Sequence, residues 1–210
     1  RPRGDRREMK RYKAVGDVSE LPSVVFGKRA ITWWGTLMFM FIEGMTVAVC
    51  AASYLYIRKN FHDWPPPPTP LPSLLIPTIG VITMLVSIVV MRRVQKAAEA
   101  LDKPAVTTGL VVMALLGMAL VALRFFDFRS LNTHWDTDAY GSTAWASVAF
   151  HSTLLFFEAI ETTVFAVLAL VGPWEMKHFS DAEDNAMYWY FMCGIWIPVY
   201  VLLFILPRWL

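Results

Sequence analysis

The chain is dominated by long apolar stretches, each of about 20 residues or more, with short polar segments between them. A hydrocarbon core about 30 Å thick is crossed by roughly 20 helical residues, since each adds 1.5 Å. Only 17% of the residues are charged, against about 25% in soluble domains, and the long stretches contain almost none of them. The sequence therefore predicts an all-α integral membrane protein, folded as one compact helical bundle.

Five membrane spans are predicted. We expect them at residues 31–57, 74–91, 106–123, 143–171 and 186–206. Pro104 suits the first turn of the third span, Gly172-Pro173 ends the fourth, and Pro198 is expected to kink the fifth. Residues 31–210 then form the membrane domain, which follows a basic tail of residues 1–30. The proline-rich stretch from Trp64 to Pro72 is expected to act as a stiff, extended spacer.

Lysine and arginine are distributed unevenly between the two sides of the membrane. The side that holds the N-terminal tail carries 14 of these residues, and the opposite side carries five. By the positive-inside rule we predict a cytoplasmic N-terminus and a C-terminus on the outside. The basic tail adjoins the first span, so it is expected to contact anionic lipid and not nucleic acid.

Four ionisable residues are predicted to lie at depth within the spans. Glu43, in the stretch FMFIEGMTV, is near the middle of the first span. In the fourth span His151 and Glu158 share a helical face, and Glu161 adjoins it. An acidic group at the bilayer centre costs about 2.5–3.5 kcal/mol on insertion scales, so such a group is expected to face protein, a lipid headgroup or internal water. We expect these four residues to form one buried polar cluster.

Three roles fit such a cluster. Buried polar groups hold helices together or bind a lipid headgroup, and intramembrane glutamate and histidine also build proton relays. A carboxylate-bridged metal centre would use Glu-x-x-His pairs. Neither pair is present, because Glu158 follows His151 by seven residues, and no metal site is predicted. The structural or lipid role and the proton role both remain open at this stage.

Five arginines near predicted helix ends are candidates for lipid headgroup binding, because long basic side chains reach toward the phosphates. Arg92 and Arg93 form a doublet at an inner end, where the leaflet is anionic, and are favoured for this role. The other three are near outer helix ends: Arg58, Arg124 and Arg129. General anchoring at the interface is the alternative for all five.

Three segments carry a resemblance to a known family. They read TWWGTLMFMFIEGMTVAVCAASYLYIRKNFHDWPP, DAYGSTAWASVAFHSTLLF and NAMYWYFMCGIWIPVYVLLF. The first resembles the first core helix of subunit III of haem-copper terminal oxidases, with its Trp-Trp-Gly start, mid-span glutamate, Tyr-x-Arg end and Trp-Pro-Pro loop. The second and third are similar to the family's Tyr-Gly-Ser and Gly-Phe-His helix and to its closing Tyr-Trp-His-Phe helix. Order and spacing agree from residue 30 to 206, and five spans match the shorter bacterial form.

The chain departs from the family pattern at several polar positions. The family's second histidine is replaced by Leu154, the histidine of the closing motif by Tyr190, and its aspartate by Cys193. Glu158 stands where the family usually has a small residue. Glu43 and His151 match the pattern, whereas much of the polar set around them does not, so the chain looks like a divergent branch.

The resemblance implies an accessory subunit without catalytic residues or redox centres, in a bacterial inner membrane. Haem and copper are then expected in partner subunits, and phospholipid is the one ligand expected here. The implied partners are the catalytic subunit I, as the main contact, with subunit II and small subunits of a cytochrome c or quinol oxidase. The implied role is to stabilise subunit I and support its proton uptake. An accessory subunit of a nitric oxide reductase is the alternative, and an independent transporter is disfavoured because no inverted repeat is apparent.

Overall fold

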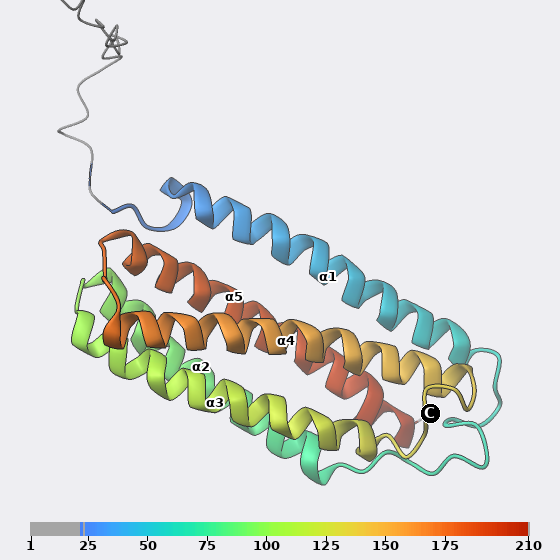
Figure 1. The fold of residues 1–210 in the computed structure, drawn as a ribbon. Helices are drawn as coiled ribbons and strands as arrows, with labels where there is room; N and C mark the ends of the chain where they lie inside the picture. Colours follow the sequence, from blue (N-terminus) through green and yellow to red (C-terminus); the bar gives the residue numbers. More distant parts are fainter. Residues whose placement is uncertain (1–21, 23, 210) are drawn as a thin grey trace, which may run out of the picture.

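The computed structural model describes residues 22 and 24–209. Five long helices follow one another along the chain and run up and down through the molecule (Figure 1). They are α1 (Ile31–Arg58), α2 (Leu75–Glu99), α3 (Lys103–Ser130), α4 (Ala139–Val171) and α5 (Lys177–Tyr200). Each is long and apolar enough to cross a membrane, and no strand occurs among the described residues. The predicted all-α, five-span fold is confirmed.

The helices extend beyond the predicted spans, mostly at their polar ends. α2 continues to Glu99, α3 begins at Lys103, and α5 begins at Lys177, well before the apolar stretch that marks its span. Composition locates the hydrocarbon-spanning part, whereas hydrogen bonding continues a helix into the interface. Most of the basic tail, residues 1–21, lies outside the described residues. The orientation of the two termini stays a prediction from the charge distribution.

Side-chain caps and small residues fix several helix ends. The carboxylate of Asp102 accepts a hydrogen bond from the Ala105 backbone N–H at 3.1 Å, at the start of α3. Asp138 caps α4 in the same way, with the Gly141 N–H at 2.7 Å. Gly141 is required there, because a Cβ atom at this position would lie 2.2 Å from the His134 carbonyl oxygen.

The last part of α5 changes its hydrogen-bonding pattern. Pro198 lies inside the helix and cannot donate a backbone hydrogen bond. A π-helical turn (Val201–Ile205) and a short 3₁₀ turn (Leu206–Arg208) follow it directly. Irregular turns of this kind are common where a proline interrupts the helical ladder.

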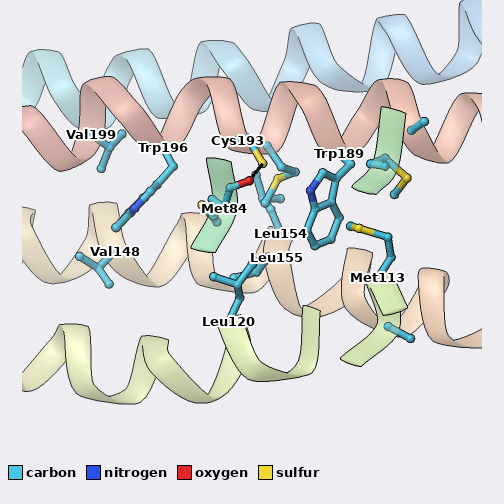
Figure 2. Close-up of a cluster of buried hydrophobic side chains, with 14 of the residues drawn as sticks. Met84, Met113, Leu120, Val148, Leu154, Leu155, Trp189, Cys193, Trp196 and Val199 are labelled. Atoms are coloured by element: carbon cyan, nitrogen blue, oxygen red, sulfur yellow. Dashed lines mark hydrogen bonds between the residues drawn. The ribbon is translucent and has the colours of Figure 1, made fainter. Parts of the chain in front are cut away.

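Helices α2, α3, α4 and α5 enclose the apolar core, and α1 lies on the outer side of α4 and α5 (Figure 1). Figure 2 shows Trp189 of α5 within the core beside Met113 of α3. Small residues allow close approach, since a Cβ atom added at Gly117 of α3 would lie 3.2 Å from the Cβ of Ala159 of α4.

The segment between α1 and α2 folds back on the bundle. It is irregular, as expected of a proline-rich spacer. Trp64, however, is buried, its indole N–H donates to the Tyr54 hydroxyl at 2.9 Å, and its ring meets that of Tyr140 edge to face. The first part of the predicted spacer is therefore packed against this end of the bundle.

Candidate functional site

A cavity of about 590 Å³ opens between α1, α4 and α5. Four carboxylates line it, together with an amide and a phenol, and no lysine or arginine is among the lining residues. These polar residues are Glu43 of α1, Glu158 and Glu161 of α4, and Asp184, Asn185 and Tyr188 of α5. The described part of the chain thus holds a concentrated acidic site within three membrane helices.

Glu43 joins α1 to α5 through a hydrogen bond. Its side chain is 5% exposed, and its carboxylate accepts a hydrogen bond from the Tyr188 hydroxyl at 2.6 Å. Phe39, one turn earlier on α1, stacks on the same tyrosine with ring centroids 6.1 Å apart. Only Glu43 and Tyr54 of α1 are buried. This carboxylate therefore faces protein and the cavity, and not open lipid.

Glu158 belongs to a second hydrogen-bonded group on the same cavity. It is 2% exposed, and the Asn185 side-chain amide donates to it at 2.9 Å. The same amide nitrogen also donates to the Thr162 hydroxyl at 3.2 Å. Glu161, one turn after Glu158, is exposed and lines the cavity from its rim. Asn185 was not predicted from the sequence, because a single asparagine beside the start of the fifth span is not a distinctive signal.

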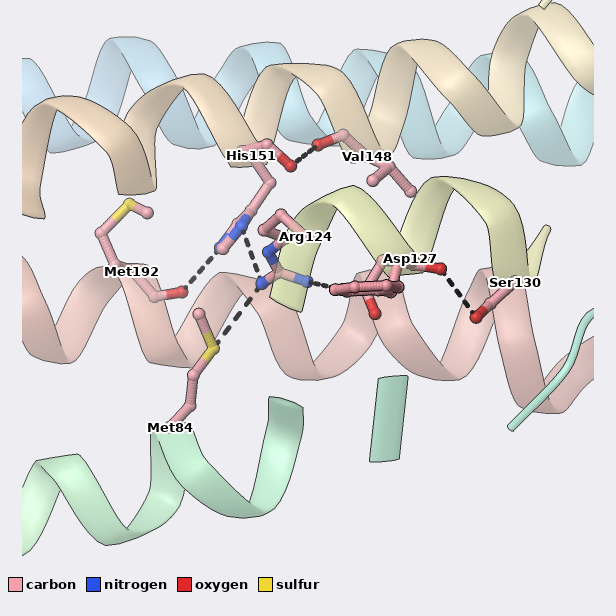
Figure 3. A network of polar contacts seen from close by, with 9 residues as sticks. Met84, Arg124, Asp127, Ser130, Val148, His151 and Met192 are labelled. Carbon is pink, nitrogen blue, oxygen red and sulfur yellow. Dashed lines mark hydrogen bonds and ion pairs between the residues drawn. The ribbon is translucent and has the colours of Figure 1, made fainter. Parts of the chain in front are cut away.

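His151 lies in a separate cluster deeper in the bundle (Figure 3). It is fully buried, with Nε2 3.0 Å from the Met192 carbonyl oxygen and Nδ1 3.3 Å from Nη2 of Arg124. A carbonyl only accepts and a guanidinium only donates, so Nε2 carries the proton and the imidazole is neutral. Trp196 covers the cluster, with its ring centroid 3.5 Å from the Arg124 guanidinium carbon.

Arg124 occupies the centre of this cluster instead of a lipid interface. Its side chain is buried, and Nη1 forms an ion pair with the Asp127 carboxylate at 2.6 Å (Figure 3). Arg124 was expected to contact a lipid headgroup, but in the structure its side chain is buried within the bundle. The physical reason is the carboxylate three residues later, which neutralises the guanidinium on the inward face of α3.

The four deep residues expected to form one cluster are divided between two. Glu43, Glu158 and Glu161 share the cavity between α1, α4 and α5, whereas His151 is absent from its lining and contacts Arg124. His151 and Glu158 are two turns apart on one face of α4, but that face meets different neighbours along its length. The sequence predicted that His151 and Glu158 share a face of α4, but it did not predict which side chains each of them contacts.

The other four arginines considered for lipid binding differ in position: Arg58 and Arg129 lie at the ends of α1 and α3, whereas Arg92 and Arg93 lie several residues before the end of α2. Arg92, Arg93 and Arg129 are exposed. Arg58 is half-buried, donates to the Phe61 carbonyl oxygen at 2.7 Å, and its guanidinium carbon lies 6.0 Å from the centroid of the Trp64 ring. Arg58 is therefore engaged by its own loop. Headgroup binding by Arg92, Arg93 and Arg129 stays a prediction.

The chemistry of the acidic cavity follows from its lining. Carboxylates and a phenol exchange protons and accept hydrogen bonds from water or from cationic groups. The surplus of acidic groups disfavours a phosphate. Among the described residues, no group of three or more histidine, cysteine, aspartate or glutamate side chains is arranged to hold a metal ion.

The fold and site together define a class: a multi-pass helical membrane protein whose outermost helix is joined to the bundle through a buried carboxylate. The family model of cytochrome c oxidase subunit III matches residues 29–208, which includes all five helices. The chain therefore belongs to the cytochrome c oxidase subunit III family, and the resemblance seen in the sequence is confirmed.

Curated relatives agree with this assignment. The chain is 23% identical over 188 residues to cytochrome c oxidase subunit 3 of Synechocystis. The aligned region covers 86% of this chain and 78% of the relative. It is 22% identical over 180 residues to the Thermostichus vulcanus subunit 3, covering 83% and 87% of the two chains. It is 25% identical over 179 residues to the probable subunit 3 of Mycobacterium bovis, covering 81% and 85%. The chain is thus a multi-pass membrane subunit of an oxidase complex.

Proposed function

We propose that this chain is the non-redox accessory subunit of a haem-copper oxidase in a bacterial inner membrane. It stabilises the catalytic subunit I, which is its main contact, and it adjoins subunit II and small subunits. Haem and copper belong to those partners, and phospholipid is the ligand of this chain. The observation that carries the proposal is the family match over residues 29–208.

Copurification tests this assignment. The tagged chain, extracted in mild detergent, is expected to bring haem-bearing partners with it, visible as a-, o- or b-type bands in a dithionite-reduced minus oxidised spectrum. Oxygen consumption by the purified complex, compared with nitric oxide consumption, separates an oxidase from a nitric oxide reductase. A haem-free single protein, obtained under conditions that preserve complexes, would contradict the proposal and favour a transporter.

The acidic cavity is proposed to support proton uptake by the catalytic subunit. One carboxylate is enough to join α1 to Tyr188, yet Glu158 and Glu161 face the same space. Intramembrane carboxylates around a shared cavity are the usual parts of proton relays. In this chain they provide groups that hold protons close to the partner subunit.

A matched pair of variants separates proton handling from helix docking. Glu43→Gln keeps an acceptor for the Tyr188 hydroxyl and removes the acid, whereas Tyr188→Phe removes the hydrogen bond and keeps the acid. We expect Glu43→Gln to lower oxidase turnover or to give it a new pH dependence while assembly persists. Tyr188→Phe should leave turnover near that of the wild type. The reverse pattern, with loss only in Tyr188→Phe, would assign Glu43 a purely structural role.

A further inference from the structure

A groove runs along α3 and α4, starting where the segment of residues 131–138 joins them. Its upper part, about 660 Å³, is lined by polar residues and by the rings of Phe128 and Trp145. Its lower part, about 390 Å³, has a mainly apolar lining that includes Val121, Ala149 and Phe157. Phe125 and Phe128 line both parts, so the two cavities adjoin. The groove is therefore amphipathic, with a polar part at one end and an apolar part at the other.

The polar end of the groove is positively charged. Arg129 is exposed there, and no described carboxylate forms an ion pair with it. No aspartate or glutamate is among the residues that line this part. This mouth contrasts with the acidic cavity between α1, α4 and α5, which would repel the same anion. A phosphate at the membrane interface is the group that matches a guanidinium at a helix end.

Aromatic contacts hold the mouth of the groove in shape. The Trp145 indole N–H donates to the Thr133 carbonyl oxygen at 2.7 Å, and its ring centroid lies 4.7 Å from that of Phe128. His134 also stacks on Trp145, with the two ring centroids 6.0 Å apart. Tryptophan at this depth is typical of the headgroup region. The wall is thus built before any ligand arrives.

The length of the groove matches one leaflet. Along α3, the eight residues from Val121 to Arg129 rise about 12 Å, and along α4 the twelve from Trp145 to Phe157 rise about 18 Å. Half of a hydrocarbon core is about 15 Å. An acyl chain that begins at the level of Arg129 would therefore end near Phe157.

We propose that this groove binds one diacyl phospholipid, with its phosphate on Arg129 and an acyl chain between α3 and α4. The inference rests on the proposed function for lipid as the ligand of this chain, and it adds the site and the group recognised. It does not require the oxidase partners, because every residue of the groove belongs to this chain.

Native mass spectrometry of the purified complex tests the proposal by counting diacyl lipids per copy of this chain. Arg129→Gln removes the phosphate contact, and Ala149→Phe fills the apolar part at an exposed position. We expect each variant to lose one lipid that the wild type retains through detergent washing. The matched controls change an exposed residue elsewhere, and both should retain it: Lys59→Gln and Ala122→Phe.

Three results would overturn the site. The lipid count could be unchanged in Arg129→Gln and Ala149→Phe. The bound species could have the mass of inorganic phosphate instead of a diacyl lipid. Ala149→Phe could release a protein subunit with no change in lipid, which would show that a partner helix fills the groove. If instead the chain purifies without haem partners but the two variants still lose the lipid, the oxidase proposal fails and the groove stands.

Discussion

The two sides of α4 are packed in different ways. On one side, α2, α3 and α5 complete a dense core in which Arg124, Asp127 and His151 are enclosed. On the other side, α1 has only two buried residues, Glu43 and Tyr54, and a cavity of about 590 Å³ lies between α1, α4 and α5. Both sides contain buried charge-bearing groups. The first joins Arg124 and Asp127 in an ion pair, whereas the carboxylates of the second line the cavity.

This difference reflects what holds helices together in lipid. Apolar surface gives no driving force between helices there, so close packing and interhelical hydrogen bonds decide the contacts. The four-helix side uses close packing, for example at Gly117 against Ala159. The α1 side uses the hydrogen bond from Tyr188 to Glu43. We infer that the dense side gives stability, whereas the open side places carboxylates on a cavity.

The largest effect is expected from breaking the ion pair of the dense side. Arg124→Leu leaves the Asp127 carboxylate buried without its partner at 2.6 Å, and this should cost about 3–5 kcal/mol of unfolding free energy. Denaturation in SDS, followed by tryptophan fluorescence, measures the loss. The double variant with Asp127→Leu should recover much of it, since no unpaired charge then remains. Equal losses in the single and double variants would show that the ion pair is not what the core depends on.

A smaller effect is expected from adding one methyl group on each side. A Cβ atom at Gly109 of α3 would lie 2.4 Å from a methyl carbon of Val94, whereas one at Gly44 of α1 would lie 3.5 Å from the ring of Phe191. Gly109→Ala should therefore lower the unfolding free energy by about 1–3 kcal/mol through overpacking. Gly44→Ala should be neutral or slightly stabilising, because alanine favours a helix. Thermal melting of the purified protein compares them, and equal tolerance would remove the contrast between the two sides.

The smallest effect is expected within the acidic cavity. Glu158→Leu removes the acceptor of the Asn185 amide at 2.9 Å, and intramembrane hydrogen bonds contribute about 0.6 kcal/mol on average, up to about 1.7. Glu158→Gln retains an acceptor oxygen and should cost less than the leucine variant. The same SDS titration measures both. A loss in Glu158→Gln as large as that of Arg124→Leu would mean that the cavity, too, is a stability element.

Much of the fold could be predicted from the sequence, because span length and composition are local properties. The helices are longer than the predicted spans: α5 begins at Lys177, whereas the apolar stretch of its span begins near residue 186. The site was predicted in part. Glu43 and Glu158 do lie on one cavity, but His151 does not. Asn185 was missed because a single amide in a polar helix start has no distinctive pattern.

The sequence by itself determined the number of spans and the family, because these depend on hydrophobic length and on motif order along the chain. The tertiary structure alone decided which groups meet. Arg124 is placed near a helix end by its position in the sequence, yet the rotation of α3 about its axis turns it toward Asp127, His151 and Trp196. Helical periodicity defines a face, whereas the neighbour of that face is set by how the five helices pack.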